Sequence, residues 1–284
     1  MLNAILLLLV SMVSIQSGAT LAKNLFPALG AAGTSSMRLF FATLILAIIF
    51  RPWRTRLTSA QVKGVAFYGL SLGLMNLLFY FALERIPLGI AVALEFTGPL
   101  TVAILASQRK LDYLWAVVAA VGIVLLLPIT EGSAHLDMLG MIFAIGAGFF
   151  WALYIVFGKK TSANVPGGVA ASYGMAFAAL VVLPFGFATA GTKLFDLSLV
   201  PLAFAVGIFS SALPYSLEMI SLKKIPASTF GVLMSVEPAI GALAGLAFLH
   251  EELSLMQWLA IACVMISSLG SSLTSKKAVV PPLE

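Results

Sequence analysis

The chain has 284 residues, of which 61% are hydrophobic and only 10% are charged, and it carries a formal net charge of +5. Soluble domains carry about 25% charged residues, so this composition excludes a soluble globular protein and indicates that lipid surrounds most of the chain. The basic residues lie in short segments between apolar stretches, which is typical of membrane topology signals and not of a nucleic-acid-binding surface.

The apolar stretches are about 18–22 residues long and lack strict alternation, which favours an all-α integral membrane protein over a β-barrel. The first stretch could imitate a signal peptide, but no basic segment precedes it, and we interpret it as a retained span. The short connections leave no room for a separate soluble domain. In chain order, the ten predicted transmembrane helices are residues 2–22, 34–50, 64–83, 88–106, 113–130, 139–158, 168–188, 200–221, 227–249 and 255–273.

The basic residues predict the orientation of the chain. If the N-terminus lies inside, the outer connections hold only three of the sixteen Lys and Arg residues, and one more, Arg38, lies within a span. Cytoplasmic loops are enriched in Lys and Arg, so the sequence predicts an N-in, C-in protein whose residues 274–284 form a cytoplasmic tail. The basic residues of the predicted inner connections and tail are Arg51, Arg54, Arg56, Lys63, Arg109, Lys110, Lys159, Lys160, Lys223, Lys224, Lys276 and Lys277.

One segment occurs twice, as LERIPLGIAVALEFTGP at 83–99 and as LKKIPASTFGVLMSVEP at 222–238. Each copy carries an Ile-Pro pair near its start and a Glu shortly before its last Pro. The two copies are offset by 139 residues, which places five spans in each half. Because five is odd, the second half enters the membrane in the opposite sense. The sequence therefore predicts two inverted five-helix repeats, at 1–130 and 139–273, with a substrate site between them near the midplane.

Four ionisable side chains fall within predicted spans: Arg38, Glu95, Glu218 and Glu237. A charge at the centre of a membrane helix costs about 2.5–3.5 kcal/mol on insertion scales, so such residues must face a polar cavity, pair with one another or lie near a boundary. A site in the membrane interior is therefore expected.

Glu95 and Glu237 are the main candidates for this site. Glu95 lies about 10 Å into its span, and Pro99 cannot donate a hydrogen bond to its carbonyl. We predict that Glu95 binds a substrate ammonium or carries a proton, the alternative being a structural pair with Arg38. Glu237 directly precedes Pro238, which disfavours helical geometry and predicts a local break. The alternative for Glu237 is an interhelical hydrogen bond.

The remaining candidates have more evenly balanced interpretations. Glu218 could be neutralised at the inner interface by Lys223 or Lys224, or it could belong to an inner gate with Tyr215. Arg38, near the outer end of its span, could extend to the surface or hold a substrate carboxylate through paired hydrogen bonds. Polar residues that could bind substrate or connect helices are Gln16, Ser71, Asn76, Tyr80 and Ser210, and the predicted hinges are Pro99, Pro214 and Pro238.

Four segments carry a resemblance to a known family: SIQSGATLAKNLFP (14–27), PLGIAVALEFTGPL (87–100), ALPYSLEMI (212–220) and TFGVLMSVEPA (229–239). They resemble the drug/metabolite transporter superfamily of EamA type, and in particular its amino-acid exporter branch. The resemblance implies ten helices in two inverted repeats, residence in the bacterial inner membrane and export of small amino acids driven by an ion gradient.

The predicted function is thus a secondary exporter of small neutral amino acids such as threonine and homoserine, coupled to protons by antiport. The expected partners are the amino acid, protons and the lipid bilayer, with no cofactor, metal or nucleic acid, and the oligomeric state stays open. An exporter of aromatic amino acids, drugs or nucleotide precursors is the nearest alternative. An intramembrane enzyme is disfavoured, because both histidines, His135 and His250, fall in predicted outer loops.

Overall fold

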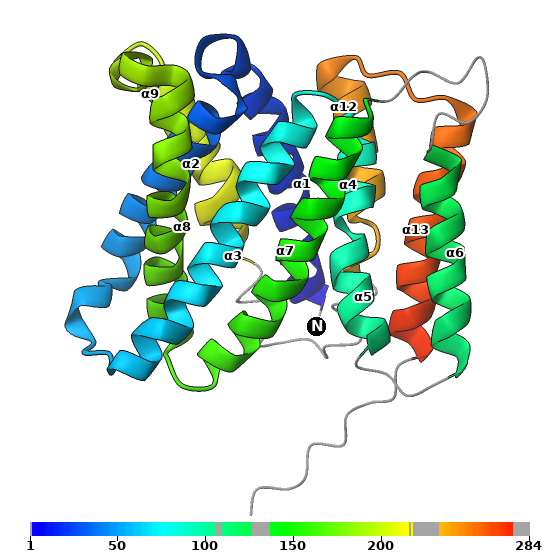
Figure 1. The fold of residues 1–284 in the computed structure, drawn as a ribbon, viewed down its shortest axis with the longest axis horizontal. Helices are drawn as coiled ribbons and strands as arrows, with labels where there is room; N and C mark the ends of the chain where they lie inside the picture. Colours follow the sequence, from blue (N-terminus) through cyan, green and yellow to red (C-terminus); the bar gives the residue numbers. More distant parts are fainter. Residues whose placement is uncertain (1, 106–109, 127–136, 216, 218–232, 275–284) are drawn as a thin grey trace, which may run out of the picture.

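The computed structural model describes residues 2–105, 110–126, 137–215, 217 and 233–274, which form helices and no strand (Figure 1). The long helices run side by side between two ends of the molecule. The α-helices are α1 (Leu2–Lys23), α2 (Phe26–Phe50), α3 (Ser59–Leu83), α4 (Leu88–Glu95), α5 (Thr97–Leu105), α6 (Lys110–Leu126), α7 (Met138–Ser162), α8 (Gly167–Ala190), α9 (Val200–Gly207), α12 (Glu237–Leu249) and α13 (Leu255–Thr274). Two 3-10 helices, η1 (Pro52–Arg54) and η2 (Gly191–Phe195), and one π-helix, η3 (Ile208–Ala212), complete the described elements.

Described helices occupy at least part of each of the ten segments that the sequence predicts as spans. Five of them, α1, α2, α3, α7 and α8, are long and apolar enough to cross a membrane by length and composition. The other five segments hold shorter apolar helices in the described part of the chain, at Leu88–Val102, Tyr113–Leu125, Val200–Tyr215, Glu237–Leu249 and Leu255–Ser271. The structure is therefore all-helical as predicted, and the number of spans stays a prediction.

The two ends of the bundle differ in charge. One end, which we call the basic end, holds the α2–α3 and α7–α8 connections and is at the bottom of Figure 1; it carries Arg51, Arg54, Arg56, Lys63, Lys159 and Lys160. The opposite end, which we call the Glu251 end, is where α1 ends, α4 begins and α12 ends. The predicted tail, at 275–284, and the residues 218–232 lie outside the described residues.

Glycines bring helices of the two predicted halves into close contact. A Cβ on Gly69 of α3 would lie 2.6 Å from the carbonyl oxygen of Gly174 in α8, and a Cβ on Gly89 of α4 would lie 2.5 Å from the Cα of Ala242 in α12. Such distances leave no room for a side chain, because the backbones themselves touch. Glycines therefore provide the points of closest approach between helices of the two predicted halves.

The first part of α2 differs from the prediction. The predicted span begins at residue 34, whereas α2 begins at Phe26 and includes a non-helical Gly30 (φ 65°, ψ 175°). Pro27 in the first turn needs no N–H partner, and Gly30 has no Cβ to oppose the left-handed conformation. The helix therefore extends further toward the Glu251 end, which places Arg38 at mid-helix.

Candidate functional site

The helix carrying Glu95 breaks where the sequence places a proline. The first part, α4, ends at Glu95, and α5 begins at Thr97, so Phe96 forms the break. Pro99 has no N–H for the carbonyl of Glu95. This carbonyl packs instead against α7, where a Cβ on Gly148 would lie 2.6 Å from it. Glycine in α7 thus lets the broken segment approach backbone to backbone.

A second break precedes Glu237. Ser235 and Val236 form a turn, and α12 starts at Glu237 with Pro238 in its first turn. Phe96 and Ser235 are separated by the same 139 residues as the repeat, so the two breaks fall at equivalent positions. Free N–H groups at the start of a helix favour a negative charge. The carboxylate of Glu237 therefore has an environment different from that of Glu95, which is at the end of its helix.

Both breaks border one central cavity of about 460 Å³, which is within the usual size range of small-molecule sites. Eight residues predicted for the site or its hinges line it: Gln16, Arg38, Asn76, Glu95, Pro99, Ser210, Tyr215 and Glu237. They come from α1, α2, α3, the α4–α5 break, η3 and the segment after it, and the start of α12. Residues far apart in the sequence are thus brought together around a single space.

Arg38 does not pair with either glutamate in the described part of the chain. Its Nε donates to the Ser211 hydroxyl at 3.0 Å, and its Nη2 donates to the carbonyl of Ser210 at 2.8 Å. The guanidinium also lies 5.2 Å from the centre of the Tyr80 ring, within cation–π range. The alternative of a structural Glu95–Arg38 pair is therefore wrong for this conformation.

The interpretation of Arg38 as a surface-seeking residue is also wrong. Arg38 is only 5% exposed, because α2 begins eight residues before the predicted span and carries the side chain into the bundle. Its two hydrogen bonds hold the π-helix η3, where the backbone departs from the regular hydrogen-bond ladder. Such π segments are frequent at functional sites. Ser211 and the π-helix are features that hydrophobic periodicity does not reveal.

The two glutamates have different hydrogen bonding. The Gln16 amide donates to Glu237 at 3.2 Å, which is the interhelical hydrogen bond that the sequence left open. Within the described residues, the carboxylate of Glu95 accepts no hydrogen bond, although it is only 7% exposed. Glu95 interacts electrostatically with both Glu237 and Arg38. The cavity therefore has an acidic side with one carboxylate available and a basic side with a fixed guanidinium.

Four predicted candidates, Ser71, Tyr80, Pro214 and Pro238, do not line the cavity. The Ser71 hydroxyl donates to the carbonyl of Phe67 within α3, and the carbonyl of Pro214 accepts from the Ser11 hydroxyl. The Ser71 bond lies within one helix, whereas the Pro214 bond joins α1 to the segment after η3. Pro238 starts α12 but does not line the cavity, and Glu218 lies outside the described residues.

Aromatic residues form much of the remaining wall. Phe96, at the first break, meets Trp151 of α7 edge-to-face with ring centres 5.6 Å apart. Tyr154, one turn further along α7, also lines the cavity, as do Phe79 and Ser268. The sequence analysis did not place Trp151 and Tyr154 together in the cavity wall. The spacing of three residues between them was the available signal, since it places both on one helix face.

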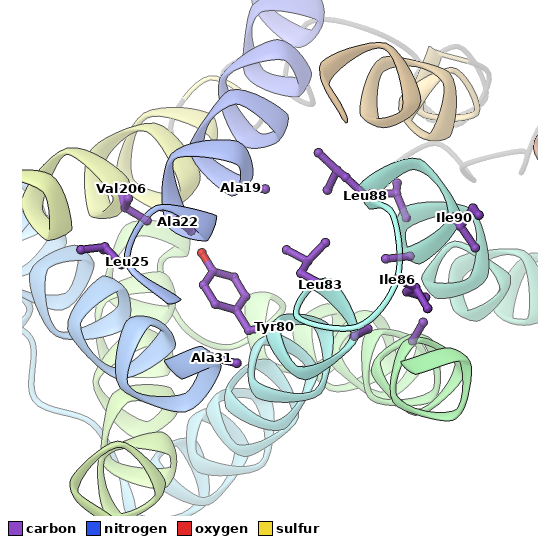
Figure 2. Close-up of a cluster of buried hydrophobic side chains, with 14 of the residues drawn as sticks. Ala19, Ala22, Leu25, Ala31, Tyr80, Leu83, Ile86, Leu88, Ile90 and Val206 are labelled. Carbon is purple, nitrogen blue, oxygen red and sulfur yellow. The ribbon is translucent and has the colours of Figure 1, made fainter. Parts of the chain in front are cut away.

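The cavity is closed toward the Glu251 end by a hydrophobic cluster around Tyr80 and Leu83 of α3 (Figure 2). Figure 2 shows the Tyr80 ring directed toward Ala22 of α1, with Leu83 beside the ring and Leu88 beyond Leu83. Ala19 belongs both to this cluster and to the cavity wall.

A junction of three residues lies beyond the cluster, and we call it the Glu251 junction. One carboxylate oxygen of Glu251 pairs with Lys23 at the end of α1 at 2.5 Å, and the other accepts from the backbone N–H of Leu88 at 2.8 Å. Glu251 thus ties α1 and the start of α4 to the connection between α12 and α13.

Comparison with known proteins identifies relatives over nearly the whole chain. The sequence pattern of the EamA-like transporter family matches residues 138–273. The chain is 49% identical to the threonine/homoserine exporter RhtA of Escherichia coli (strain K12), over 96% of this chain and 92% of that protein. It is 48% identical, over the same shares, to RhtA of Salmonella typhimurium (strain LT2). A solved crystal structure matches with a TM-score of 0.62 at 17% identity, covering 95% of this chain and 96% of the other, and shares the fold.

Proposed function

The chain belongs to the EamA-like transporter family, and from this premise we propose that it exports small neutral amino acids such as threonine and homoserine by secondary transport. Its relatives are transporters and it is not an enzyme. The observation that carries the proposal is the buried cavity with the Glu95 carboxylate on one side and the Arg38 guanidinium on the other. A zwitterionic amino acid has the complementary charges, and electrostatic attraction is strong in a space with little water.

In the proposed mechanism, Glu95 takes the substrate ammonium or a proton, since its carboxylate accepts no hydrogen bond from the other described residues. Arg38 faces the substrate carboxylate, and Glu237 with Gln16 forms the opposing wall. A carboxylate that binds either a proton or the substrate, but not both, couples their movements in opposite directions. This competition is the physical basis that we propose for proton antiport.

The proposed architecture is ten spans in two inverted repeats, 1–130 and 139–273, with both termini in the cytoplasm of a bacterium and the chain in its inner membrane. Three features support it: the equivalent positions of the two helix breaks, the close contact of α4 with α12, and the concentration of Lys and Arg at one end. Under this orientation the basic end faces the cytoplasm. Pro99 and Pro238 would then be hinges at the inner edges of the two walls.

Transport assays in proteoliposomes test this proposal with radiolabelled threonine. Two reactions separate the roles of Glu95: exchange against unlabelled threonine, and uptake driven by a pH gradient. We expect the wild type to perform both and Glu95→Gln to lose the proton-driven reaction by at least tenfold, while Glu84→Gln, at an exposed position on the same half, retains it. If Glu95 carries only the proton, the variant keeps exchange; if it binds the ammonium, exchange falls as well. Unchanged proton-driven transport in Glu95→Gln would remove Glu95 from the mechanism.

The aromatic wall favours a second candidate function, the export of aromatic amino acids. Phe96, Trp151 and Tyr154 present ring surfaces on which a flat side chain could stack. Competition of threonine exchange by homoserine and by phenylalanine separates the two: stronger inhibition by phenylalanine than by homoserine would favour the aromatic substrate.

A further inference from the structure

A second cavity of about 490 Å³ lies between the central cavity and the basic end. The two share Tyr154, Ile155 and Tyr215 in their walls, so they adjoin. The second cavity extends from there to the end of α7 and the start of α8. A solute approaching the central cavity from the basic end would pass through this space.

The polar lining of this second cavity attracts negative charge. Lys159, near the end of α7, is an exposed cation in its wall. Gly167 and Gly168 form the first turn of α8, a helix of 24 residues whose N-cap, Pro166, provides no capping side chain. The positive end of the helix dipole and its free N–H groups therefore add to the charge of Lys159. No Asp or Glu is among the described residues of this wall.

A buried hydroxyl gives independent evidence for a ligand in this cavity. Thr161 lines it and is only 5% exposed, and its Oγ1 has no hydrogen-bond partner in the part of the chain that the structure describes. Buried polar atoms nearly always have a partner, since leaving one unpaired costs about 1–3 kcal/mol. A bound oxygen atom of a ligand would supply the missing hydrogen bond. The adjacent Ser162 also lines the cavity, but its hydroxyl already donates to the carbonyl of Lys159 at 3.1 Å.

We propose that this cavity is a separate loading site that binds the carboxylate of the free amino acid before the substrate reaches Glu95 and Arg38. Lys159, the hydroxyl of Thr161 and the first turn of α8 bind the carboxylate. Tyr68 and Tyr154, whose stacked rings lie 4.9 Å apart, form the passage toward the central cavity. This inference rests on the proposed function, because it assigns the first step of the same transport reaction to a second site.

Matched variants at neighbouring lysines test the loading site. Lys159 and Lys160 are adjacent and both exposed, but only Lys159 lines the cavity. Threonine is supplied on the side of the vesicle membrane that the basic end faces. Under this condition we expect Lys159→Gln to raise the KM for threonine about fivefold, which is the scale of one exposed ionic contact, with kcat unchanged. Lys160→Gln should leave both constants at the wild-type value, and Lys159→Arg should restore most of the affinity. Threoninol, which lacks the carboxylate, should inhibit both lysine variants equally.

The outcomes separate the loading site from the proposed function and from other anions. If the wild type transports neither threonine nor homoserine, the proposed function fails. If it transports threonine and Lys159→Gln matches Lys160→Gln, only the loading site is refuted. A lipid phosphate would use the same chemistry, so the assay is repeated in vesicles of pure phosphatidylcholine and in vesicles containing phosphatidylglycerol. An effect of Lys159→Gln that occurs only with phosphatidylglycerol would show a lipid site and overturn the proposal.

Discussion

From the contacts of the Glu251 junction we predict how stably the cavity is closed toward the Glu251 end. Replacing Glu251 with Ala removes the ion pair to Lys23 and the hydrogen bond from the N–H of Leu88. Both contacts break if the connection between α12 and α13, which carries Glu251, moves away from α1 and α4 to open the cavity toward this end. The substitution should therefore favour the open conformation without changing any residue of the central cavity.

The size of the effect follows from the two contacts. A hydrogen bond to a charged group contributes about 1.5–3 kcal/mol, and an ion pair with partial exposure about 0–1 kcal/mol. The Lys23 and Glu251 side chains are 22% and 14% exposed, so the ion pair is only partly screened by solvent. A combined loss of about 2–3 kcal/mol changes the ratio of closed to open molecules by about 30- to 150-fold.

Cysteine labelling measures this ratio. Ala19 is 4% exposed and lies between the closing cluster and the cavity, so a cysteine there reacts only when this end opens. In a background with Cys263→Ser, Ala19→Cys is labelled with a membrane-impermeant maleimide from the outside of intact cells. We expect the labelling rate to rise about 30- to 150-fold with Glu251→Ala and less with Lys23→Met.

The ion pair between Arg85 and Asp137 is the matched control, because it lies at the same end but has side chains that are 40% and 37% exposed. Arg85→Met should change the labelling rate little. The reasoning is refuted if Glu251→Ala leaves the rate unchanged or if Arg85→Met raises it equally. Labelling of Ala19→Cys only from the cytoplasmic side would instead refute the proposed orientation.

Two further predictions concern packing and pH. A Cβ on Gly98 would lie 1.9 Å from the carbonyl oxygen of Gly148, so Gly98→Ala should lower the free energy of unfolding by about 1–3 kcal/mol. Gly146→Ala is the control, because its Cβ would meet only a flexible Leu78 methyl at 3.2 Å. Equal melting temperatures of the two variants in detergent would contradict this prediction. The hydrogen bond from Arg85 lowers the pKa of Asp137 from its ordinary value of 3.8. The ionised carboxylate therefore stabilises the start of α7 at a pH above 3.8, and this stabilisation is lost as the pH falls through the lowered pKa. Asp137→Asn should therefore flatten the dependence of the melting temperature on pH below about 4, and an unchanged profile would exclude the contribution.

The sequence predicted the helix breaks because proline has a local effect on the backbone. Pro99 and Pro238 have no backbone N–H to donate a helical hydrogen bond. The helices therefore break at Phe96 and before Glu237, whatever the packing around them. Burial of charge added the second constraint, since Glu95, Glu237 and Arg38 all needed a polar space in an apolar bundle. These two local arguments were sufficient to identify the three charged residues of the cavity wall, Arg38, Glu95 and Glu237.

The contacts that depend on helix rotation could not be predicted in this way. Ser71 and Asn76 are both buried polar residues of α3, yet only Asn76 lines the cavity, because five residues along a helix rotate the side chain to another face. The pairing of Lys23 with Glu251 joins residues 228 positions apart. Charge counting placed Lys23 in an outer connection but contained no information about its partner.

The two copies of the repeated segment explain why the site is asymmetric. The prolines are at equivalent positions, but Glu95 ends one helix and Glu237 begins another, with the residue equivalent to Glu237 being Gly98. Glycine at 98 is required for contact with the backbone of Gly148, so a carboxylate cannot occupy that position in the first copy. The first copy carries its Glu three residues earlier, where the side chain reaches the cavity while the backbone packs against α7. Close helix packing therefore displaced one carboxylate, and the resulting unlike walls suit a substrate whose two ends carry opposite charges.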